Sequence, residues 1–338
     1  MSASGLPFDD FRELLRNLPG PDSAALVAAR ERDKQLTKPP GALGRLEEIA
    51  FWLAAWTGRP PAVTRPLVAI FAGNHGVTQQ GITPYPSSVT AQMVENFAAG
   101  GAAINQICVT HDLGLKVFDL ALDYPTADIT QEAALSERDC AATMAFGMEA
   151  VAGGTDLLCI GEMGIGNTTI AAAINLALYG GTAEEWVGPG TGSEGEVLQR
   201  KVAAVKRAVE LHRAHLSDPL EVLRRLGGRE IAAMAGAILA ARMQKIPVIL
   251  DGYVATAAGA ILRAANPAAL DHCLIGHVSA EPGHLKSIEK LGKTPLLALG
   301  MRLGEGTGAA LAAGIVKAAA ACHSGMATFV QAGVSNRT

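Results

Sequence analysis

Short apolar runs that end in glycine or a polar residue recur along this chain, and a helix-length amphipathic segment follows each of them. This alternation is typical of parallel strands joined by crossover helices, so we expect an α/β fold built on a parallel sheet. The runs predict strands at 67–72, 116–121, 156–160, 248–250 and 273–275, with a possible sixth at 296–299. The intervening segments predict helices at 87–99, 137–151, 168–179, 195–215, 230–244 and 253–265.

The two ends of the chain have a different pattern from the middle. Residues 1–60 have helical periodicity without a strand, and Pro39 and Pro40 force an extended break between two helices. The last thirty or so residues, after Gly304, are helical as well. We therefore expect a large α/β domain at 61–285 that binds nucleotide and base, and a small, mainly helical domain at 1–60 plus 286–338.

Composition excludes several classes of partner. The net charge is -4, so the chain offers no basic field for a nucleic acid or an anionic bilayer, and no apolar run is long enough to span a membrane. The five cysteines form no C-x-x-C pair, and the N-terminus lacks the basic-then-apolar order of a signal peptide. These features predict a cytoplasmic protein with reduced cysteines and no metal site.

A glycine-rich loop follows one of the predicted strands. The run DLLCI leads into GEMGIGNTT, which contains Gly164, Gly166, Asn167 and Thr168 and opens a helix. Free backbone N–H groups at a helix N-terminus can bind a phosphate, although a plain strand-to-helix turn capped by Thr168 would look the same. The loop matches neither G-x-G-x-x-G nor the Walker A sequence, so it names no nucleotide family by itself.

Two acidic residues keep a dinucleotide-binding interpretation open. Glu184 and Glu185 lie about 20 residues beyond the glycine loop, the spacing at which dinucleotide-binding folds place a ribose-binding acid. However, no strand pattern precedes them in GGTAEEWVG. The sequence therefore favours this interpretation only weakly.

A second glycine-rich turn, VGPGTG, contains Gly190 and precedes a helix that carries Lys201. The apolar stripe of that helix is formed by Leu198, Val202, Val205 and Val209, and Lys201 falls on the flank of this stripe. A cation there can reach into a cleft, whereas the ordinary alternative is a surface lysine with a buried stem.

Further candidates follow other strands. His75 and Asp251 each come directly after a strand, so either could be catalytic, and SAE at 279–281 follows a third. Glu305 is flanked by glycines and precedes an alanine-rich helix that must be largely buried. Burial raises the pKa of a carboxyl group and makes it a suitable general base, while a first-turn carboxylate that complements the helix dipole is the simpler interpretation.

Taken together, these segments resemble the nicotinate-nucleotide:dimethylbenzimidazole phosphoribosyltransferases. The resemblance covers residues from about 37 to 320, in order, and rests on nine segments: TKPPGALGRLE, NHGV, YPSSVTAQMVENF, GEMGIGNTT, VGPGTG, GGREIAAMAG, PVILDGYVATAA, GHVSAEPGH and MRLGEGTGAALA. It implies a Rossmann-like parallel sheet, a smaller helical domain made from both chain ends, and a homodimer with active sites near the interface.

The resemblance also implies roles for individual residues. Glu305 corresponds to the general base and Glu162 lies beside the nicotinate nucleotide. The nucleotide and its phosphate would be held by Gly164, Gly166, Asn167, Thr168, Gly190, Lys201 and Ser279. The base would be held by Asn74, Tyr85, Gln92, Met93 and Leu303. Many members carry Asp where this chain has Asn74, which leaves the polarity of the pocket open.

The implied reaction moves ribose 5-phosphate from nicotinate mononucleotide to dimethylbenzimidazole or a related base. Nicotinate leaves ribose C1′ as a pyridine whose ring nitrogen was already cationic, so no acid, metal or cofactor is needed. The incoming azole must lose a ring proton, which requires a carboxylate. The alternatives are a nicotinamide-dependent oxidoreductase, which would bind a dinucleotide, and a regulator that binds nucleotide without turnover.

Overall fold

The protein is described by a computed structural model that covers residues 5–335. Its centre is a six-stranded sheet in which neighbouring strands are parallel, in the order β2-β1-β3-β4-β5-β6. This confirms the expected α/β fold. The strands are β1 Pro66–Ala72, β2 Gly114–Asp119, β3 Leu157–Met163, β4 Val248–Leu250, β5 Cys273–His277 and β6 Pro295–Leu297.

Five strands occur where the apolar runs predict them, and the possible sixth is present as β6. The largest difference is at the end of β3, which continues three residues beyond the predicted limit of 160. Glu162 and Met163 there pair with Phe71 and Ala72 of β1. Glu162 therefore lies on a strand, held by the sheet, and not in the glycine loop that follows it.

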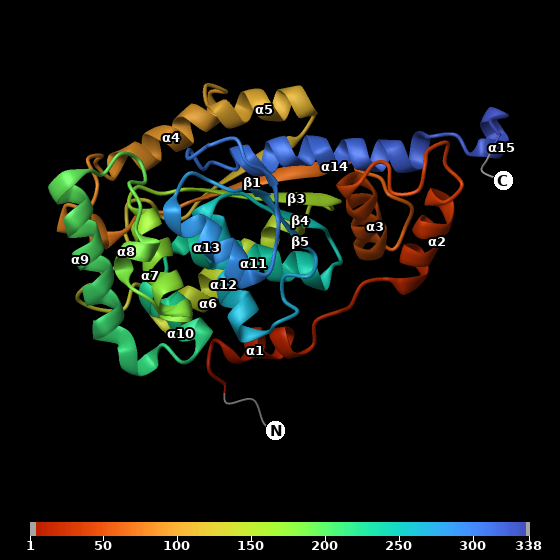
Figure 1. Cartoon of the computed structure of the whole chain (residues 1–338). Helices are drawn as coiled ribbons and strands as arrows, with labels where there is room; N and C mark the ends of the chain where they lie inside the picture. Colours follow the sequence, from red (N-terminus) through yellow and green to blue (C-terminus); the bar gives the residue numbers. More distant parts are fainter. Residues whose placement is uncertain (1–4, 336–338) are drawn as a thin grey trace.

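Helices surround the sheet, and the six that were predicted with bounds, α4, α6, α7, α9, α11 and α12, begin within one residue of the predicted positions (Figure 1). Short helices such as α5, α10 and α13 are additions to the prediction, because their apolar patterns are too brief to separate from loops. The helices are α1 Asp9–Arg16, α2 Ser23–Asp33, α3 Arg45–Thr57, α4 Ser88–Ala98, α5 Ala103–His111, α6 Glu137–Met148, α7 Asn167–Tyr179, α8 Ala183–Trp186, α9 Gly195–His212, α10 Pro219–Leu226, α11 Arg229–Met243, α12 Tyr253–Ala265, α13 Pro282–Leu291, α14 Thr307–Gly325 and α15 Phe329–Ala332.

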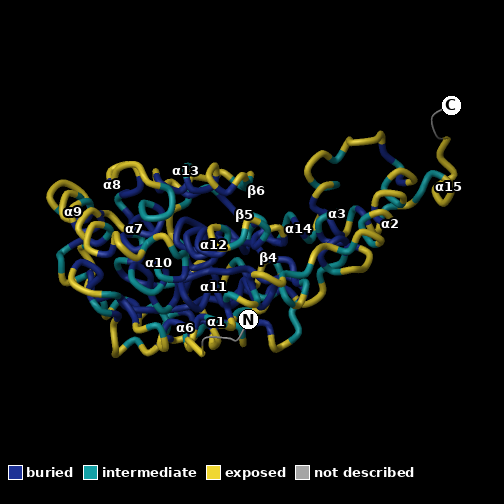
Figure 2. Tube along the Cα trace, turned by 90° about the horizontal axis from the view of Figure 1, so that it is seen from below, coloured by how far each residue is buried: buried dark blue, intermediate teal, exposed yellow. Residues whose placement is uncertain are grey.

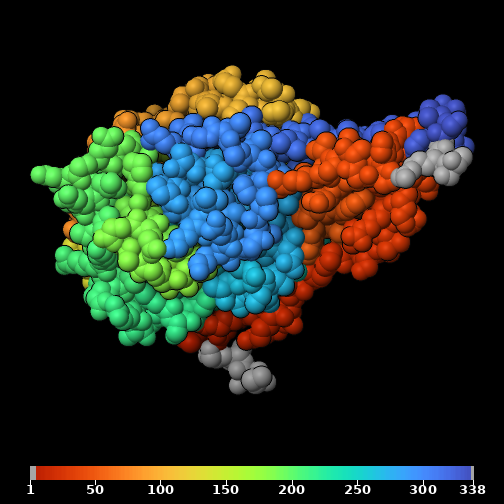
Figure 3. All heavy atoms as spheres, in the orientation of Figure 1, coloured from red at the N-terminus to blue at the C-terminus, as the bar shows by residue number. Residues whose placement is uncertain are grey.

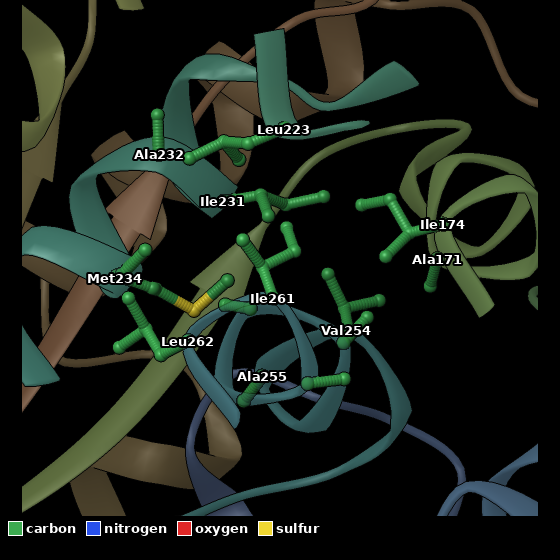
Figure 4. Packing of buried hydrophobic residues seen from close by; sticks show 14 of the residues in the cluster. Ala171, Ile174, Leu223, Ile231, Ala232, Met234, Val254, Ala255, Ile261 and Leu262 are labelled. Carbon is green, nitrogen blue, oxygen red and sulfur yellow. The ribbon is translucent and has the colours of Figure 1, made fainter. Parts of the chain in front are cut away.

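The central strands β1, β3, β4 and β5 are largely buried on both faces, and their successive residues face opposite sides of the sheet. Val68 and Ile70 of β1 belong to a core with α3, α5 and α14, whereas Ala69 and Phe71 belong to a larger core with α6, α7, α11 and α12. Figure 4 shows part of the larger core, where Ile174 of α7, Ile231 of α11 and Ile261 of α12 converge. Burial on both faces explains why the strands are continuous apolar runs.

Helix α14 packs very closely on the sheet, and this contact explains the small residues in its sequence. A Cβ atom placed on Gly161 of β3 would lie 2.4 Å from the backbone nitrogen of Gly306, just before α14. A Cβ on Gly276 of β5 would lie 2.9 Å from Cα of Ala309. Glycine in the strands and alanine in the helix thus allow the two backbones to approach.

The two ends of the chain meet beside the sheet. Figures 2 and 3 show α2 and α3 as an arm at one end of the molecule, next to α15 and the last turns of α14. Leu36 forms an antiparallel bridge with Thr328, and Arg32 donates hydrogen bonds to the backbone oxygens of His323, Ser324 and Met326. Helix α1 packs on the larger core through Phe8, Phe11 and Leu15. The division at residues 61 and 285 stays a prediction.

Two further observations concern the chain as a whole. Within residues 5–335, no helix is both long enough and apolar enough to cross a membrane. All five cysteines are free, and four of them are buried.

Candidate functional site

The order of the strands creates a switch point between β1 and β3. After β1 the chain moves to β2 on one side, and it then returns to place β3 on the other side. Ligands of open parallel sheets bind beyond the carboxyl ends of the strands at such a point. The segments after β1 and β3 meet there, since the backbone nitrogen of Gly73 donates to the oxygen of Met163 at 2.9 Å.

The glycine loop after β3 leads into α7, as the sequence predicts. The residue that caps the helix is Gly166, with a φ of 91° that favours glycine, and the side chain of Thr168 does not cap it. Thr168 is therefore not the N-cap that the plain-turn alternative assigned to it. Asn167 and Thr168 occupy the first turn instead, where free backbone N–H groups and the helix dipole favour an anion.

Lys201 of α9 reaches this first turn from the side. Its ammonium group donates hydrogen bonds to Thr168 Oγ1 and to the backbone oxygen of Gly188, both at 2.8 Å. Only 2% of Lys201 is exposed, and burial lowers its pKa to about 8, opposed by the charge of Glu281. Lys201 is thus a buried cation beside the glycine loop, and the surface-lysine alternative is wrong.

Two side chains form hydrogen bonds with the backbone of the second glycine turn. The backbone nitrogen of Gly190 donates to Glu281 Oε1 at 2.7 Å, and Arg302 Nη1 donates to the oxygen of Gly190 at 3.0 Å. Glu281 precedes α13, while Arg302 belongs to the segment before α14. Through these bonds the turn that carries Gly190 contacts both the start of α13 and the MRLGEG segment.

Glu162 lies at the carboxyl end of β3 and is 9% exposed. The amide of Asn167 donates a hydrogen bond to Glu162 Oε2. Burial, together with the charges of Asp251, Glu230 and Glu305, raises the pKa of Glu162 to about 8 against the opposing effect of the Asn167 hydrogen bond. These surroundings favour the protonated form of the Glu162 carboxyl group.

Glu305 lies in the loop that directly precedes α14. It is 5% exposed and adopts a φ of 62°, between Gly304 at 83° and Gly306 at 78°. Burial raises the pKa of Glu305 to about 7, and the charge of Asp251 contributes in the same direction. A carboxylate with this pKa is suited to accept a proton at neutral pH.

The two glutamates belong to one site. A Cβ atom on Gly304 would lie 2.6 Å from Glu162 Oε1, so only glycine fits beside that carboxyl group. Together with the two glycine-rich turns, this region lines a cavity. It is lined by Glu162, Met163, Gly164, Ile165, Asn167, Thr168, Gly190, Thr191, Gly252, Tyr253, Val254, His277, Ser279, Glu281, Arg302, Leu303 and Gly304.

Comparison with known proteins agrees with this geometry. A family model described as phosphoribosyltransferase matches residues 18–334. A protein of Sinorhizobium fredii (strain NBRC 101917 / NGR234), named nicotinate-nucleotide–dimethylbenzimidazole phosphoribosyltransferase, is 92% identical over 337 residues and covers 100% of both chains. A protein of the same name from Rhizobium meliloti (strain 1021) is 91% identical over the same extent. The chain belongs to this phosphoribosyltransferase family.

Solved structures of the family extend the match to the fold. The crystal structure of the nicotinate-nucleotide–dimethylbenzimidazole phosphoribosyltransferase from Thermus thermophilus has a TM-score of 0.85 and 42% sequence identity. It covers 94% of this chain and 100% of that chain. The chain is therefore an enzyme of the phosphoribosyltransferase family, with the Rossmann-like architecture expected from its sequence.

The residues predicted to bind the base are more scattered than the residues predicted to bind the phosphate. Leu303 lines the cavity and is 55% exposed, whereas Tyr85, 48% exposed, and Gln92 lie at the surface. Met93 packs partly on the α14 core, and Asn74 donates to the oxygen of Leu122 at 3.0 Å. Asn74, Tyr85, Gln92 and Met93 are thus outside the cavity lining found within residues 5–335.

The segment that contains Tyr85, Gln92 and Met93 nevertheless adjoins the candidate site. Thr90 is buried, and its hydroxyl accepts a hydrogen bond from the backbone nitrogen of Ile165 at 3.2 Å. Through this bond α4 contacts the glycine loop. No signal in the sequence pointed to Thr90 beyond its place in the YPSSVTAQMVENF segment.

Several cavity residues escaped sequence reasoning. His277 forms the end of β5, and Arg302 reaches across the cavity to Gly190. Both lie in segments that carry the family resemblance, which was the available signal. Ser279, which was predicted, lines the cavity, and its backbone nitrogen donates to His284 Nδ1 at 2.9 Å.

The remaining acidic candidates lie elsewhere. Glu184 and Glu185 are on the short helix α8, where they pair with Lys206 and Lys286 at the surface. No strand precedes them, so they do not occupy the ribose-binding position of a dinucleotide fold. Within the described residues, no three His, Cys, Asp or Glu side chains are arranged to hold a metal ion.

Proposed function

We propose that this enzyme transfers ribose 5-phosphate from nicotinate mononucleotide to dimethylbenzimidazole or a related base, giving α-ribazole phosphate and nicotinate. The observation that carries the proposal is the arrangement of a single cavity. Its lining includes Asn167 and Thr168 at a helix N-terminus and Glu162, a carboxyl group with a raised pKa. Two further groups lie next to the lining: the buried Lys201 donates to Thr168, and Glu305, whose pKa is also raised, follows Gly304. The names of full-length relatives more than 90% identical support the choice of substrates.

The 5′-phosphate is assigned to the Lys201 side. Gly164, Gly166, Asn167 and Thr168 surround the first turn of α7, and Lys201 already donates to Thr168. Hydrogen bonds between charged partners are roughly twice as strong as neutral ones, so the phosphate would anchor the donor here. Gly190 and Ser279 line the same cavity and would contact the rest of the nucleotide.

Glu305 is assigned as the general base. One ring nitrogen of the azole attacks ribose C1′, the C1′–N bond to nicotinate breaks, and its electron pair remains on the pyridine nitrogen. The proton of the other azole nitrogen passes to Glu305. Attack from the face opposite the leaving group inverts C1′ and gives the α-riboside. The raised pKa of Glu305 supports this role, because a base that titrates near the working pH accepts protons most efficiently.

Glu162 is assigned a different role from Glu305. With a pKa of about 8 its carboxyl group carries a proton at neutral pH and can donate a hydrogen bond. Its suitable partner is an anionic part of the donor, such as the nicotinate carboxylate. The base-binding role of Asn74, Tyr85, Gln92, Met93 and Leu303 is part of the same proposal.

We further propose a homodimer in the cytoplasm. Tyr85, Leu299 and Leu303 are large apolar side chains that are roughly half exposed, and Leu303 lies at the mouth of the cavity. Exposed apolar side chains at a site commonly mark a contact with another chain. Five free cysteines suit a reducing compartment.

A direct test incubates the protein with nicotinate mononucleotide and a panel of azole bases and identifies the products by mass. We expect nicotinate and a riboside phosphate of the added base in equal amounts. A dinucleotide-dependent hydride transfer, or nucleotide binding without any product, would refute the proposal. Glu196→Gln, on the exposed face of α9, serves as a variant that should leave the product unchanged.

A further inference from the structure

Asp251 connects the sheet to the loop that carries Glu305. It follows β4 directly and is 1% exposed. Its Oδ2 accepts a hydrogen bond from the backbone nitrogen of Gly306 at 3.1 Å, and its Oδ1 accepts one from Ala309 at 2.8 Å. One buried carboxyl group therefore holds both the residue after Glu305 and the first turn of α14.

The loop requires such a restraint. Gly304, Glu305 and Gly306 all have positive φ, and the value of 62° at Glu305 is unfavourable for a residue with a side chain. A conformation of this kind persists only where the surroundings impose it. The two hydrogen bonds that Asp251 accepts from Gly306 and Ala309 restrain the backbone around Glu305 in this conformation.

His277 faces Asp251 from the neighbouring strand β5. Its Nε2 lies 3.8 Å from Asp251 Oδ1, and both side chains are 1% exposed. His277 also packs against Gly308, where a Cβ atom would lie 2.0 Å from His277 Cδ2. Asp251, His277 and the first turn of α14 therefore form one buried unit beneath Glu305.

Other charged groups face this unit from the elements packed around it. Glu162 lies on β3. On α11, Glu230 Oε1 lies 2.7 Å from His75 Nε2, and the charge of Glu230 acts on Glu162. His284 and Glu281 belong to the α13 side, and Arg302 precedes Glu305 on its own loop. Asp251 differs from all of these because it alone accepts hydrogen bonds from the α14 turn within the described residues.

We propose that Asp251 is the positioning residue of the general base, fixing the loop that presents Glu305 and supplying a negative charge beneath it that His277 partly balances. This inference rests on the proposed role of Glu305. Asp251 does not contact the reacting atoms in this scheme, so it acts only through Glu305.

The electrostatics of the site agree with the geometry. Burial and the charge of Asp251 together raise the pKa of Glu305 to about 7. Burial also raises the pKa of Asp251, whereas His277 and the N–H groups of Ala309 and Gly306 favour its charged form. Removing the charge of Asp251 should therefore lower the pKa of Glu305. Removing His277, which counteracts the negative charge of Asp251, should raise the pKa of Glu305.

The test measures kcat against pH for the full-length enzyme with saturating nicotinate mononucleotide and dimethylbenzimidazole. In Asp251→Asn, which keeps the shape of the side chain, the acidic limb should move to lower pH by about 1 unit. In His277→Gln the limb should move to higher pH. Damage to the fold alone would not shift the two profiles in opposite directions. Opposite shifts are expected because Asp251→Asn removes negative charge near Glu305, whereas His277→Gln leaves the charge of Asp251 unopposed.

Asp156→Asn is the matched control. Asp156 is also a buried carboxylate beside β3, and it accepts hydrogen bonds from the backbone nitrogens of Thr64 and Arg65 at 2.9 and 2.8 Å. It lies at the opposite end of the strand from Glu162. This variant should lose stability without any shift of the pH profile.

The outcomes separate this inference from the proposed function. An unshifted acidic limb in Asp251→Asn, or an equal shift in Asp156→Asn, overturns the positioning role. If Asp251→Asn does not fold, the upward shift in His277→Gln decides, and its absence overturns the inference. Glu305→Gln with unchanged kcat would instead remove the proposed role of Glu305, whatever the Asp251 variants show.

Discussion

The ammonium group of Lys201 lies 2.8 Å from the hydroxyl of Thr168, so the helix α9 contributes a cation to the first turn of α7. Thr168 follows the glycine loop after β3, and Lys201 lies on the helix that follows the second glycine turn. Their contact therefore joins the two glycine-rich parts of the proposed phosphate site. Lys201 is buried, which strengthens its interaction with an anion relative to a surface lysine.

Lys201→Ala should weaken the use of nicotinate mononucleotide by roughly 10- to 150-fold in kcat/KM, because a hydrogen bond to a charged group contributes roughly 1.5 to 3 kcal/mol. Steady-state kinetics with nicotinate riboside, which lacks the phosphate, should show little change. Lys206→Ala, on the exposed side of the same helix, is the control. An equal loss with both donors would assign Lys201 another role.

Glu305→Gln should lower kcat with a neutral azole by about 10² to 10⁴, the usual contribution of general base catalysis. Glutamine keeps the shape and a hydrogen bond but cannot accept the proton, so binding of the donor should change little. An acceptor that is already anionic should lose much less activity in the variant. Near-normal kcat with a neutral azole at saturation would make Glu162 the leading candidate for the base.

Glu162→Gln should stabilise the folded protein at pH 8 and not at pH 4. The pKa of Glu162 is about 8 in the folded state, above the ordinary value of 4.5. The folded state thus binds more protons between these values, and the carboxyl group makes stability fall as pH rises through that window. Each unit of pKa difference corresponds to about 1.4 kcal/mol. Thermal unfolding at both pH values measures the effect, and an equal change at both would contradict it.

Gly161→Ala should destabilise the enzyme by about 1 to 3 kcal/mol, because its Cβ would lie 2.4 Å from the backbone nitrogen of Gly306. The clash displaces the start of α14 and with it Glu305, so kcat should fall as well. Urea unfolding and steady-state kinetics measure the two effects. Gly325→Ala, at the far end of α14 with nothing within 4 Å, should change neither.

The parallel α/β architecture could be predicted from local patterns in the chain. Strands buried on both faces must be continuous apolar runs, and Val248–Leu250 was predicted to the residue for this reason. The glycine loop before α7 was equally visible, because tight turns demand glycine. Glu305 between glycines and Lys201 on the flank of its helix were candidates from local patterns as well, and the family resemblance then implied their roles.

How these residues act depends on contacts made by the folded chain. Periodicity placed Lys201 on the flank of its helix. In the folded chain Lys201 contacts Thr168 and Gly188 and is buried, and this burial lowers the pKa of its ammonium group. Glu162 was expected in a loop, but pairing with Phe71 extends β3 through it. The partnership of Asp251 with Gly306 and Ala309 joins residues more than fifty positions apart. Local patterns record which face of an element is apolar, whereas pKa values and long-range hydrogen bonds depend on neighbours that only folding brings together.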